Sequence, residues 1–152
     1  MCNFILIDNR KSIIEKAKTA GFNAIYGDFF KEIVKIPRHI ICSASNPSFT
    51  FGGGFDRQLQ ENFPFYCREK QSRYNEKNER IGNICFVISV DNRINATDEL
   101  VRDALIFARD NTEEGETLCL TAIGCLIGGL NEDVFMEILQ EVMKSPPVKE
   151  KI

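Results

Sequence analysis

Residues 40–56 read IICSASNPSFTFGGGFD, and the features in this stretch follow one another in an informative order. It begins with apolar residues, breaks at Asn46-Pro47 and passes three consecutive glycines. From Phe55 onward, apolar residues recur at helical spacing. The stretch therefore predicts a buried strand, a loop and then a helix.

The loop between this strand and this helix has the chemistry of a phosphate site. Glycines carry no Cβ atom, so a ligand can approach the main-chain N–H groups closely. The helix that follows directs its unpaired N–H groups and its positive dipole end toward the same loop. Asn46 and Asp56 bracket the loop, and an amide and a carboxylate can bind sugar hydroxyls or position a water. The alternative is a tight strand-to-helix turn that binds no ligand.

A second glycine-rich loop occurs near the end of the chain. Residues 117–123 predict a strand, and Gly124-Cys125-Leu126-Ile127-Gly128-Gly129 follows it directly. Asn131 is then a suitable N-cap for a last helix with acidic residues in its first turn. Two such loops at the ends of parallel strands can hold two phosphates of one ligand between them.

The first quarter of the chain indicates a parallel sheet. Residues 3–8 predict a buried strand, Ser12 is a candidate cap for a short helix, and residues 23–26 predict a second strand. A strand, a helix and another strand in this order favour a βαβ crossover. Asp28 follows the second strand, where it can cap a helical turn or contact a ligand.

The rest of the chain alternates apolar and polar segments. Residues 84–90 form a continuous apolar run typical of a strand covered on both faces. Thr97 predicts the cap of a helix with a buried stripe through Ala108. Residues 64–81 carry many charges of both signs, which predicts a solvated helix or a mobile loop.

Length and charge limit the classes of function. The chain has 152 residues and a net charge of −3, and we expect one domain over residues 1–145 with a flexible tail at 146–152. The negative charge argues against direct binding to nucleic acid or to anionic membranes. No apolar run has transmembrane length and no signal-type segment opens the chain, so we expect a cytoplasmic protein. The six cysteines have no metal-site spacing, and we expect reduced core residues and no metal.

Three stretches together resemble the macrodomains, a family of ADP-ribose-binding modules. Asn46, the glycines at 52–54, an apolar residue and Asp56 resemble the first ligand loop of that family. Tyr26-Gly27-Asp28-Phe29 resembles the turn whose carboxylate binds the adenine amino group in macrodomains. Residues 121–131 resemble the second, phosphate-binding loop. The resemblance extends from Ile25 to Val142.

The resemblance implies a three-layer α/β/α fold, with a mixed and mostly parallel sheet flanked by helices. It implies binding of ADP-ribose or a related nucleotide, free or attached to an ADP-ribosylated macromolecule, and it implies no cofactor. If the protein is a hydrolase, Asp56 and Asn46 would be the catalytic pair. The implied ligand-binding residues are Asp28, Phe29, Ser45, Gly52, Gly53, Gly54, Phe55, Gly124, Cys125, Leu126, Ile127, Gly128 and Gly129.

The sequence also departs from the macrodomain pattern. Ser43 stands where the family often has an asparagine, and Leu126 falls where the family has a glycine. The usual final strand is missing, and the strand at residues 3–8 could occupy an edge of the sheet instead. Three alternatives therefore stay open: a module that only binds ADP-ribose, a hydrolase of ADP-ribosyl or ADP-ribose-phosphate linkages, and an α/β domain with another nucleotide ligand or a structural role.

Overall fold

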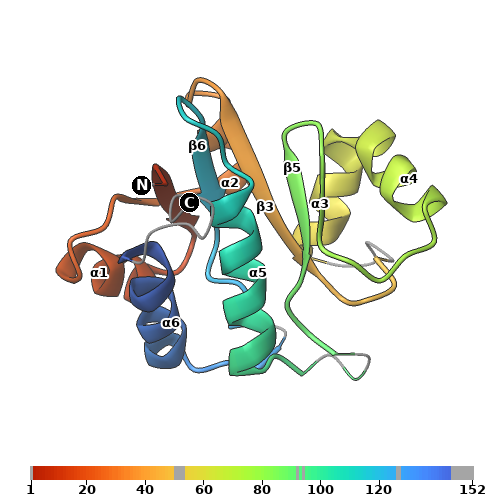
Figure 1. Ribbon diagram of the computed structural model, residues 1–152. Helices are drawn as coiled ribbons and strands as arrows, with labels where there is room; N and C mark the ends of the chain where they lie inside the picture. The colour runs from red at the N-terminus through yellow and green to blue at the C-terminus, as the bar shows by residue number, and fades with distance from the viewer. Residues whose placement is uncertain (1, 50–53, 92, 94, 126–127, 145–152) are drawn as a thin grey trace, which may run out of the picture.

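The computed structural model describes residues 2–49, 54–91, 93, 95–125 and 128–144. Within these residues it contains six strands and six helices (Figure 1). In chain order they are β1 (Phe4–Asp8), α1 (Lys11–Thr19), β2 (Ala24–Tyr26), α2 (Phe29–Ile33), β3 (His39–Ser45), α3 (Gly54–Asn62), α4 (Pro64–Ser72), β4 (Glu79–Ile81), β5 (Ile84–Ile88), α5 (Asp98–Asp110), β6 (Thr117–Leu120) and α6 (Glu132–Lys144).

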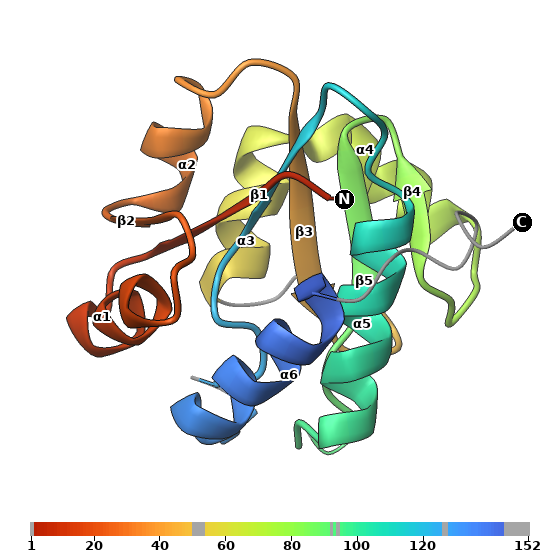
Figure 2. The ribbon, with the colours of Figure 1, turned by 60° about the vertical axis from the view of Figure 1, so that its left-hand side comes forward.

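The strands form one mixed sheet in the order β2-β1-β6-β3-β5-β4. Every neighbouring pair is parallel except β4 and β5, which form an antiparallel hairpin at one edge. Helices α1, α5 and α6 pack on one face of the sheet, and α2, α3 and α4 pack on the other (Figure 2). The predicted three-layer α/β/α arrangement with a mostly parallel sheet is therefore confirmed.

Alternation along the strands creates two apolar cores, because successive side chains of a strand point to opposite faces. In β3, Ile40 and Cys42 belong to the core under α1, α5 and α6, whereas Ile41 belongs to the core under α2, α3 and α4. Cys42, Cys85 and Cys119 are buried with free thiols, as expected of cysteines in apolar strands.

Side-chain caps begin several helices where the sequence predicts them. The Asp28 carboxylate accepts a hydrogen bond from Lys31 N at 3.2 Å, and Thr97 Oγ1 accepts one from Leu100 N at 3.1 Å. The prediction for Ser12 was wrong, because Arg10 occupies the N-cap position of α1. The Ser12 hydroxyl instead donates to the Glu132 carboxylate at 2.8 Å and ties α1 to α6.

Two other expectations need correction. Residues 64–81 are neither one solvated helix nor a mobile loop: they form α4, a turn and the edge strand β4. Strand β1 lies inside the sheet between β2 and β6, so residues 3–8 do not provide an edge strand. Strand β1 forms hydrogen bonds with a neighbour on each side, and Leu6 and Ile7 point to opposite faces of the sheet and are both buried. Burial on both faces is typical of a central parallel strand.

The topology positions the two glycine-rich loops next to each other. Strands β3 and β6 are parallel neighbours with His39 paired to Thr117, so the loops that follow them leave the same edge of the sheet. From β1 the chain adds β2 on one side, and from β3 it adds β5 and β4 on the other side. Strand β6 lies between β1 and β3, so the direction of strand addition reverses there. Ligands of open α/β sheets bind at such a reversal, beyond the carboxyl ends of the strands.

None of the helices formed by the described residues is long and apolar enough to cross a membrane.

An ion pair at the opposite end of the sheet contributes to stability. Arg80 Nη1 and Nη2 each donate to the Glu116 carboxylate at 2.8 Å, and these bonds help lower the pKa of Glu116 from its ordinary value of 4.5 to about 2. Glu116→Gln is expected to reduce the free energy of unfolding at pH 7 by about 1–3 kcal/mol. Because the pKa is depressed in the folded protein, the difference from wild type should disappear as the pH falls from 4.5 toward 2.

Urea denaturation at several pH values measures this difference. Glu141→Gln is the matched control, since the Arg102–Glu141 pair is more exposed, with side-chain exposures of 36% and 59%. That variant should lose at most about 1 kcal/mol. Equal effects of the two variants, or an effect of Glu116→Gln that persists at pH 2, would contradict this assignment.

Candidate functional site

Asp56 lies in the first turn of α3, directly after the glycines of the first loop. The Ser45 hydroxyl donates to Asp56 Oδ2 at 2.7 Å, across the junction between β3 and α3. Asp56 Oδ1 is buried and has no hydrogen-bond partner within the described part of the chain. One carboxylate oxygen is therefore held in place, while the hydrogen-bonding capacity of the other is unused by the described residues.

Burial changes the acidity of this carboxylate. It raises the pKa of Asp56 from 3.8 to about 6, against a smaller lowering effect of the Ser45 hydrogen bond. The neighbouring Cys67 thiol on α4 is also affected: burial and the Asp56 charge raise the pKa of Cys67 to about 12. The thiol is therefore protonated at neutral pH and is a poor nucleophile, which leaves Asp56 as the reactive acid-base group here.

The alternation of β3 explains how Ser45 reaches Asp56. Ser43, Ser45 and Ile41 share the strand face that packs against α3. Both serines are almost completely buried, and Ser43 Oγ, like Asp56 Oδ1, lacks a hydrogen-bond partner among the described groups. Two unsatisfied polar atoms on the same side of the sheet are unusual for a packed interior, and a functional group or a bound water or ion accounts for such atoms in other proteins.

Asn46 begins the first loop with a tight turn. Its side-chain Oδ1 accepts a hydrogen bond from Ser48 N at 3.0 Å, and its backbone carbonyl accepts one from Phe49 N at 3.1 Å. Phe49 ends the turn with a φ of 51°, a left-handed conformation that is rare for an aromatic residue. The Asn46 side chain thus shapes the loop, and its contact with a ribose stays a prediction.

The predicted adenine side of the site joins the first loop through aromatic packing. Asp28 is exposed at the carboxyl end of β2, where it caps α2 and keeps its carboxylate at the surface. Phe29 is buried, with its ring centroid 5.3 Å from that of Phe30 and 4.9 Å from that of Phe55. Phe55 therefore brings the Asp28 turn and the start of α3 together, although the two stretches lie more than twenty residues apart.

The second loop is closed by backbone hydrogen bonds. Gly124 has a φ of 80°, and its carbonyl accepts a hydrogen bond from Leu130 N at 2.9 Å. Ala96 N donates to the Gly128 carbonyl at 3.0 Å, which joins this loop to the segment before α5. A Cβ atom at Gly128 would lie 2.7 Å from Ala96 Cβ and 2.8 Å from the Gly124 carbonyl oxygen. Glycine at position 128 is thus a steric requirement of this turn.

Several predicted ligand-binding residues cannot be placed, because Gly52, Gly53, Leu126 and Ile127 lie outside the described residues. Gly54 is the first residue of α3, where its N–H group belongs to the helix N-terminus. Cys125 is half-buried in the second loop, and burial raises the pKa of its thiol to about 11. That thiol is neutral at physiological pH.

The sequence did not reveal an ion pair between the buried Asp8 and the partly exposed Arg10, next to the start of the second loop. Asp8, at the end of β1, accepts hydrogen bonds from Arg10 Nε and Nη2, both at 2.9 Å, and from Ala122 N at 3.1 Å. The pair links the end of β1 to the residues that follow β6 and thereby supports the loop. A carboxylate at the end of a predicted parallel strand, with an arginine two residues later, is the signal that could have indicated this role.

No cluster of metal-ligating side chains occurs among the residues that the structure describes. His39 lies at the start of β3, away from the carboxyl edge, and its Nδ1 is 2.9 Å from the Ile36 carbonyl oxygen. The described chemistry at the carboxyl edge of β3 is therefore that of a carboxylate, hydroxyls and backbone N–H groups.

Comparison with known proteins establishes only the fold. No protein-family model matches the chain, and no curated protein matches its sequence. The structure is similar to one described as a protein of unknown function from Bacteroides thetaiotaomicron, with a TM-score of 0.60 and 16% identity over 90% of this chain and 88% of that chain. At this identity the likeness shows a shared α/β fold and carries no information about the ligand.

Proposed function

We propose that this protein binds ADP-ribose, or a nucleotide derived from it, between its two glycine-rich loops. The observation that carries the proposal is the buried Asp56 carboxylate at the start of α3, bonded to Ser45 and with one oxygen unpartnered among the described groups. The second loop leaves the neighbouring parallel strand and leads into the N-terminus of α6. Two helix N-termini and two glycine-rich loops at one edge of a sheet suit a diphosphate.

The same geometry supports hydrolysis at the distal ribose of an ADP-ribosyl group. Asp56 Oδ1 would take a proton from a water molecule, whose oxygen forms a bond to the ester carbon or to the phosphorus atom of the substrate. The bond to the leaving oxygen breaks with its electron pair, that oxygen takes up the proton held by Asp56, and backbone N–H groups of the loops stabilise the charge that develops in between. A carboxylate with a pKa of about 6 is ionised at neutral pH and is a stronger base than an ordinary aspartate.

Binding without turnover is the second candidate, and one observation favours it. Asn46 Oδ1 is already occupied by Ser48 N at 3.0 Å, and the residue three positions earlier is a buried serine rather than an asparagine. The macrodomain pattern often has two asparagines that can orient a ribose beside the water. Here one of the two positions is a serine, and the oxygen of the other asparagine already accepts a hydrogen bond from the loop. A binding module needs the loops but not this orientation.

Calorimetric titration with ADP-ribose tests the proposal, with ADP and adenosine monophosphate as matched controls. The two-loop site should bind ADP-ribose at least about tenfold more tightly than either control, because only ADP-ribose carries the distal ribose; tenfold corresponds to about 1.4 kcal/mol. Equal affinity for ADP and ADP-ribose would favour a different nucleotide ligand. No heat with any of the three would refute the proposal.

A further inference from the structure

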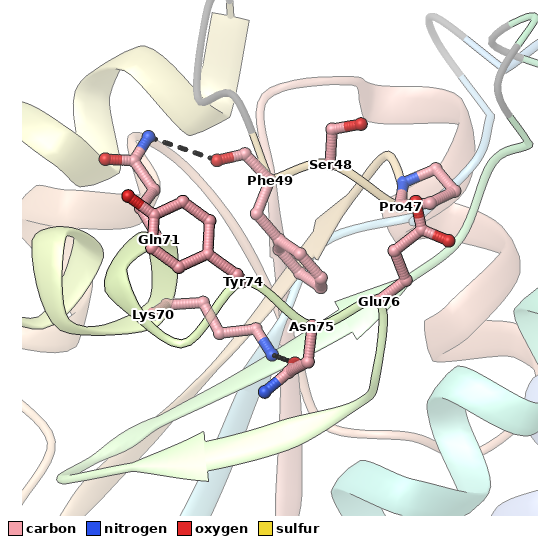
Figure 3. Close-up of a pocket in the computed structure, with 8 residues that line it drawn as sticks. All are labelled: Pro47, Ser48, Phe49, Lys70, Gln71, Tyr74, Asn75 and Glu76. Carbon is pink, nitrogen blue, oxygen red and sulfur yellow. Dashed lines mark hydrogen bonds between the residues drawn. The ribbon is translucent and has the colours of Figure 1, made fainter.

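A cavity of about 350 Å³ lies beside the first loop rather than between the two loops. Its lining comes from three segments: the turn after Asn46, the end of α4 and the turn that leads to β4 (Figure 3). Asn78, at the end of this last turn, accepts a hydrogen bond from Ile88 N at 2.8 Å. Because Ile88 ends β5 and pairs with Ser45, the cavity lies at the carboxyl edge of the sheet, on the β5 side of the candidate site.

The rigid part of the cavity is built from Phe49 and Lys70. Lys70 is buried, and its amine donates to Asn75 Oδ1 at 2.7 Å, to the Lys77 carbonyl at 2.8 Å and to Glu79 Oε1 at 2.9 Å. The same amine lies 4.5 Å from the centre of the Phe49 ring. All three ammonium donors are used, so Lys70 provides structure and no free positive charge for an anion.

The accessible part of the cavity combines an aromatic ring with amides. Tyr74 is 93% exposed, and its backbone has a φ of 49°, stabilised by a hydrogen bond from its N–H to the Gln71 carbonyl at 3.2 Å. The Gln71 side chain donates to the Phe49 carbonyl at 3.2 Å, and its own oxygen points away from Phe49 (Figure 3). Phe49 and Tyr74 are two of three non-glycine residues with positive φ in the described chain. Such conformations concentrate at ligand sites.

These features select one chemical class of ligand. An exposed aromatic ring beside amide groups suits a flat heterocycle that stacks and also exchanges hydrogen bonds. The Lys70 charge is compensated and Glu76 adds a carboxylate, so a phosphate or carboxylate group is disfavoured. The volume is at the small end of the range for ligand pockets, which suits a single ring system and excludes a folded partner.

We propose that this cavity binds a flat aromatic heterocycle carried on the distal ribose of the ligand. The inference rests on the proposed function: Asn46 precedes the cavity-lining Pro47, Ser48 and Phe49, so a ribose beside Asn46 would have its outer substituent next to the cavity. The heterocycle could be a nucleobase or the nicotinamide ring of a dinucleotide. Both present a flat face and hydrogen-bonding edges.

The test compares probes with and without the ring on three variants and the wild type. Calorimetry measures the affinities for NAD⁺ and ADP-ribose, which differ in the ring on the distal ribose. Saturation-transfer NMR measures the binding of nicotinamide riboside, thymidine and adenosine. Tyr74→Ala should reduce the affinity for at least one ring-bearing probe about 5- to 150-fold and leave the affinity for ADP-ribose unchanged. Tyr74→Phe, which keeps the ring, should retain the affinity. Phe65→Ala removes another exposed aromatic, 69% exposed on α4 outside the cavity lining, and should have no effect.

The outcomes separate the two proposals. The ring probe that responds to Tyr74→Ala identifies the source of the heterocycle. If no ring-bearing probe binds, or if Tyr74→Ala changes none of them, the cavity proposal is overturned while ADP-ribose binding still stands on its own titration. If a nucleoside binds in a Tyr74-dependent manner but ADP-ribose does not bind, the cavity does bind a heterocycle. The proposed function is then refuted, and so is the claim that the heterocycle is carried on the distal ribose of an ADP-ribose-like ligand.

Discussion

Replacing Asp56 with asparagine is expected to reduce the rate of hydrolysis of an ADP-ribosyl ester by about 100- to 10,000-fold, the usual contribution of a positioned general base. Asparagine has nearly the same shape as aspartate, and its side-chain oxygen can still accept the Ser45 hydrogen bond. The affinity for ADP-ribose should therefore change little. Single-turnover release of the product measures the rate, and calorimetry measures the affinity.

The pH dependence gives this prediction a second test. Because the ionised form of Asp56 is the base, the wild-type rate should rise tenfold per pH unit up to about pH 6 and then level off. Ser12→Ala is a suitable control variant, since the Ser12 hydroxyl bonds to Glu132 on the other face of the sheet. If Asp56→Asn leaves the rate of hydrolysis intact, the chemistry belongs to another group. If the wild-type protein shows no turnover at all, the binding-only candidate is favoured.

The same substitution should increase stability. The folded-state pKa of Asp56 is raised from 3.8 to about 6, so the folded protein holds this proton more tightly than the unfolded chain and loses stability as the pH rises through that window. Above pH 6, asparagine removes the cost of a buried charge, which we expect to be about 1–3 kcal/mol. The gain should be absent at pH 4. Such a trade of stability for function is typical of active-site carboxylates.

Lys70→Met is expected to lower the free energy of unfolding by about 3 kcal/mol, near the lower end of the range for breaking a buried ion pair. Methionine fills most of the space but leaves Asn75 Oδ1 and the Lys77 carbonyl without their donor. The cost is limited because Glu79 keeps its hydrogen bond from Arg73 at 2.6 Å. Burial alone would raise the pKa of Glu79, but the bonds from Lys70 and Arg73 outweigh that effect and lower it.

Arg73→Met is the matched control for this prediction. Arg73 contacts the same Glu79 carboxylate, but its side chain is 39% exposed, so its loss should cost much less than the loss of Lys70. Urea denaturation at pH 7 compares the two variants. A Lys70→Met protein as stable as the Arg73→Met protein would show that the buried amine contributes no more stability than the exposed arginine.

Much of the fold could be predicted because the relevant signals are local. The apolar runs that became β3 and β5 and the helical stripe of α5 follow from periodicity alone. The N-caps Asp28 and Thr97 follow from residue type and position. Each of these features depends on neighbours within a few residues, which a single sequence displays directly.

The features that were missed depend on distant partners. Strand β4 lies in a highly charged segment and forms because β5 offers an antiparallel edge. Lys70 is buried only because Asn75, Lys77 and Glu79 fold back over it, and a lysine among mixed charges otherwise predicts a solvated face. Asp8 meets Ala122 across 114 positions, a contact that no local pattern reveals.

In the candidate site, too, the local features could be predicted and the contacts between distant residues could not. The glycine loops and Asp56 could be singled out from residue type alone, because glycines let a ligand approach the backbone closely and a carboxylate can act as an acid or a base. The Ser45 hydrogen bond to Asp56 and the cavity beside Phe49 were not, because each requires α3 or α4 to pack against the end of β3. The sequence alone therefore indicates which residues can act, and the packing shows which groups hold them.

The most direct test of the central claim is a heteronuclear NMR titration of the protein with ADP-ribose. The account predicts that the amide signals of Gly54 and Asp56, at the start of α3, and of Gly124, Gly128 and Gly129, in the second loop, shift together with one affinity. Shifts confined to one loop, shifts centred elsewhere on the sheet, or no shifts at millimolar ADP-ribose would contradict the claim that the two loops form one nucleotide site.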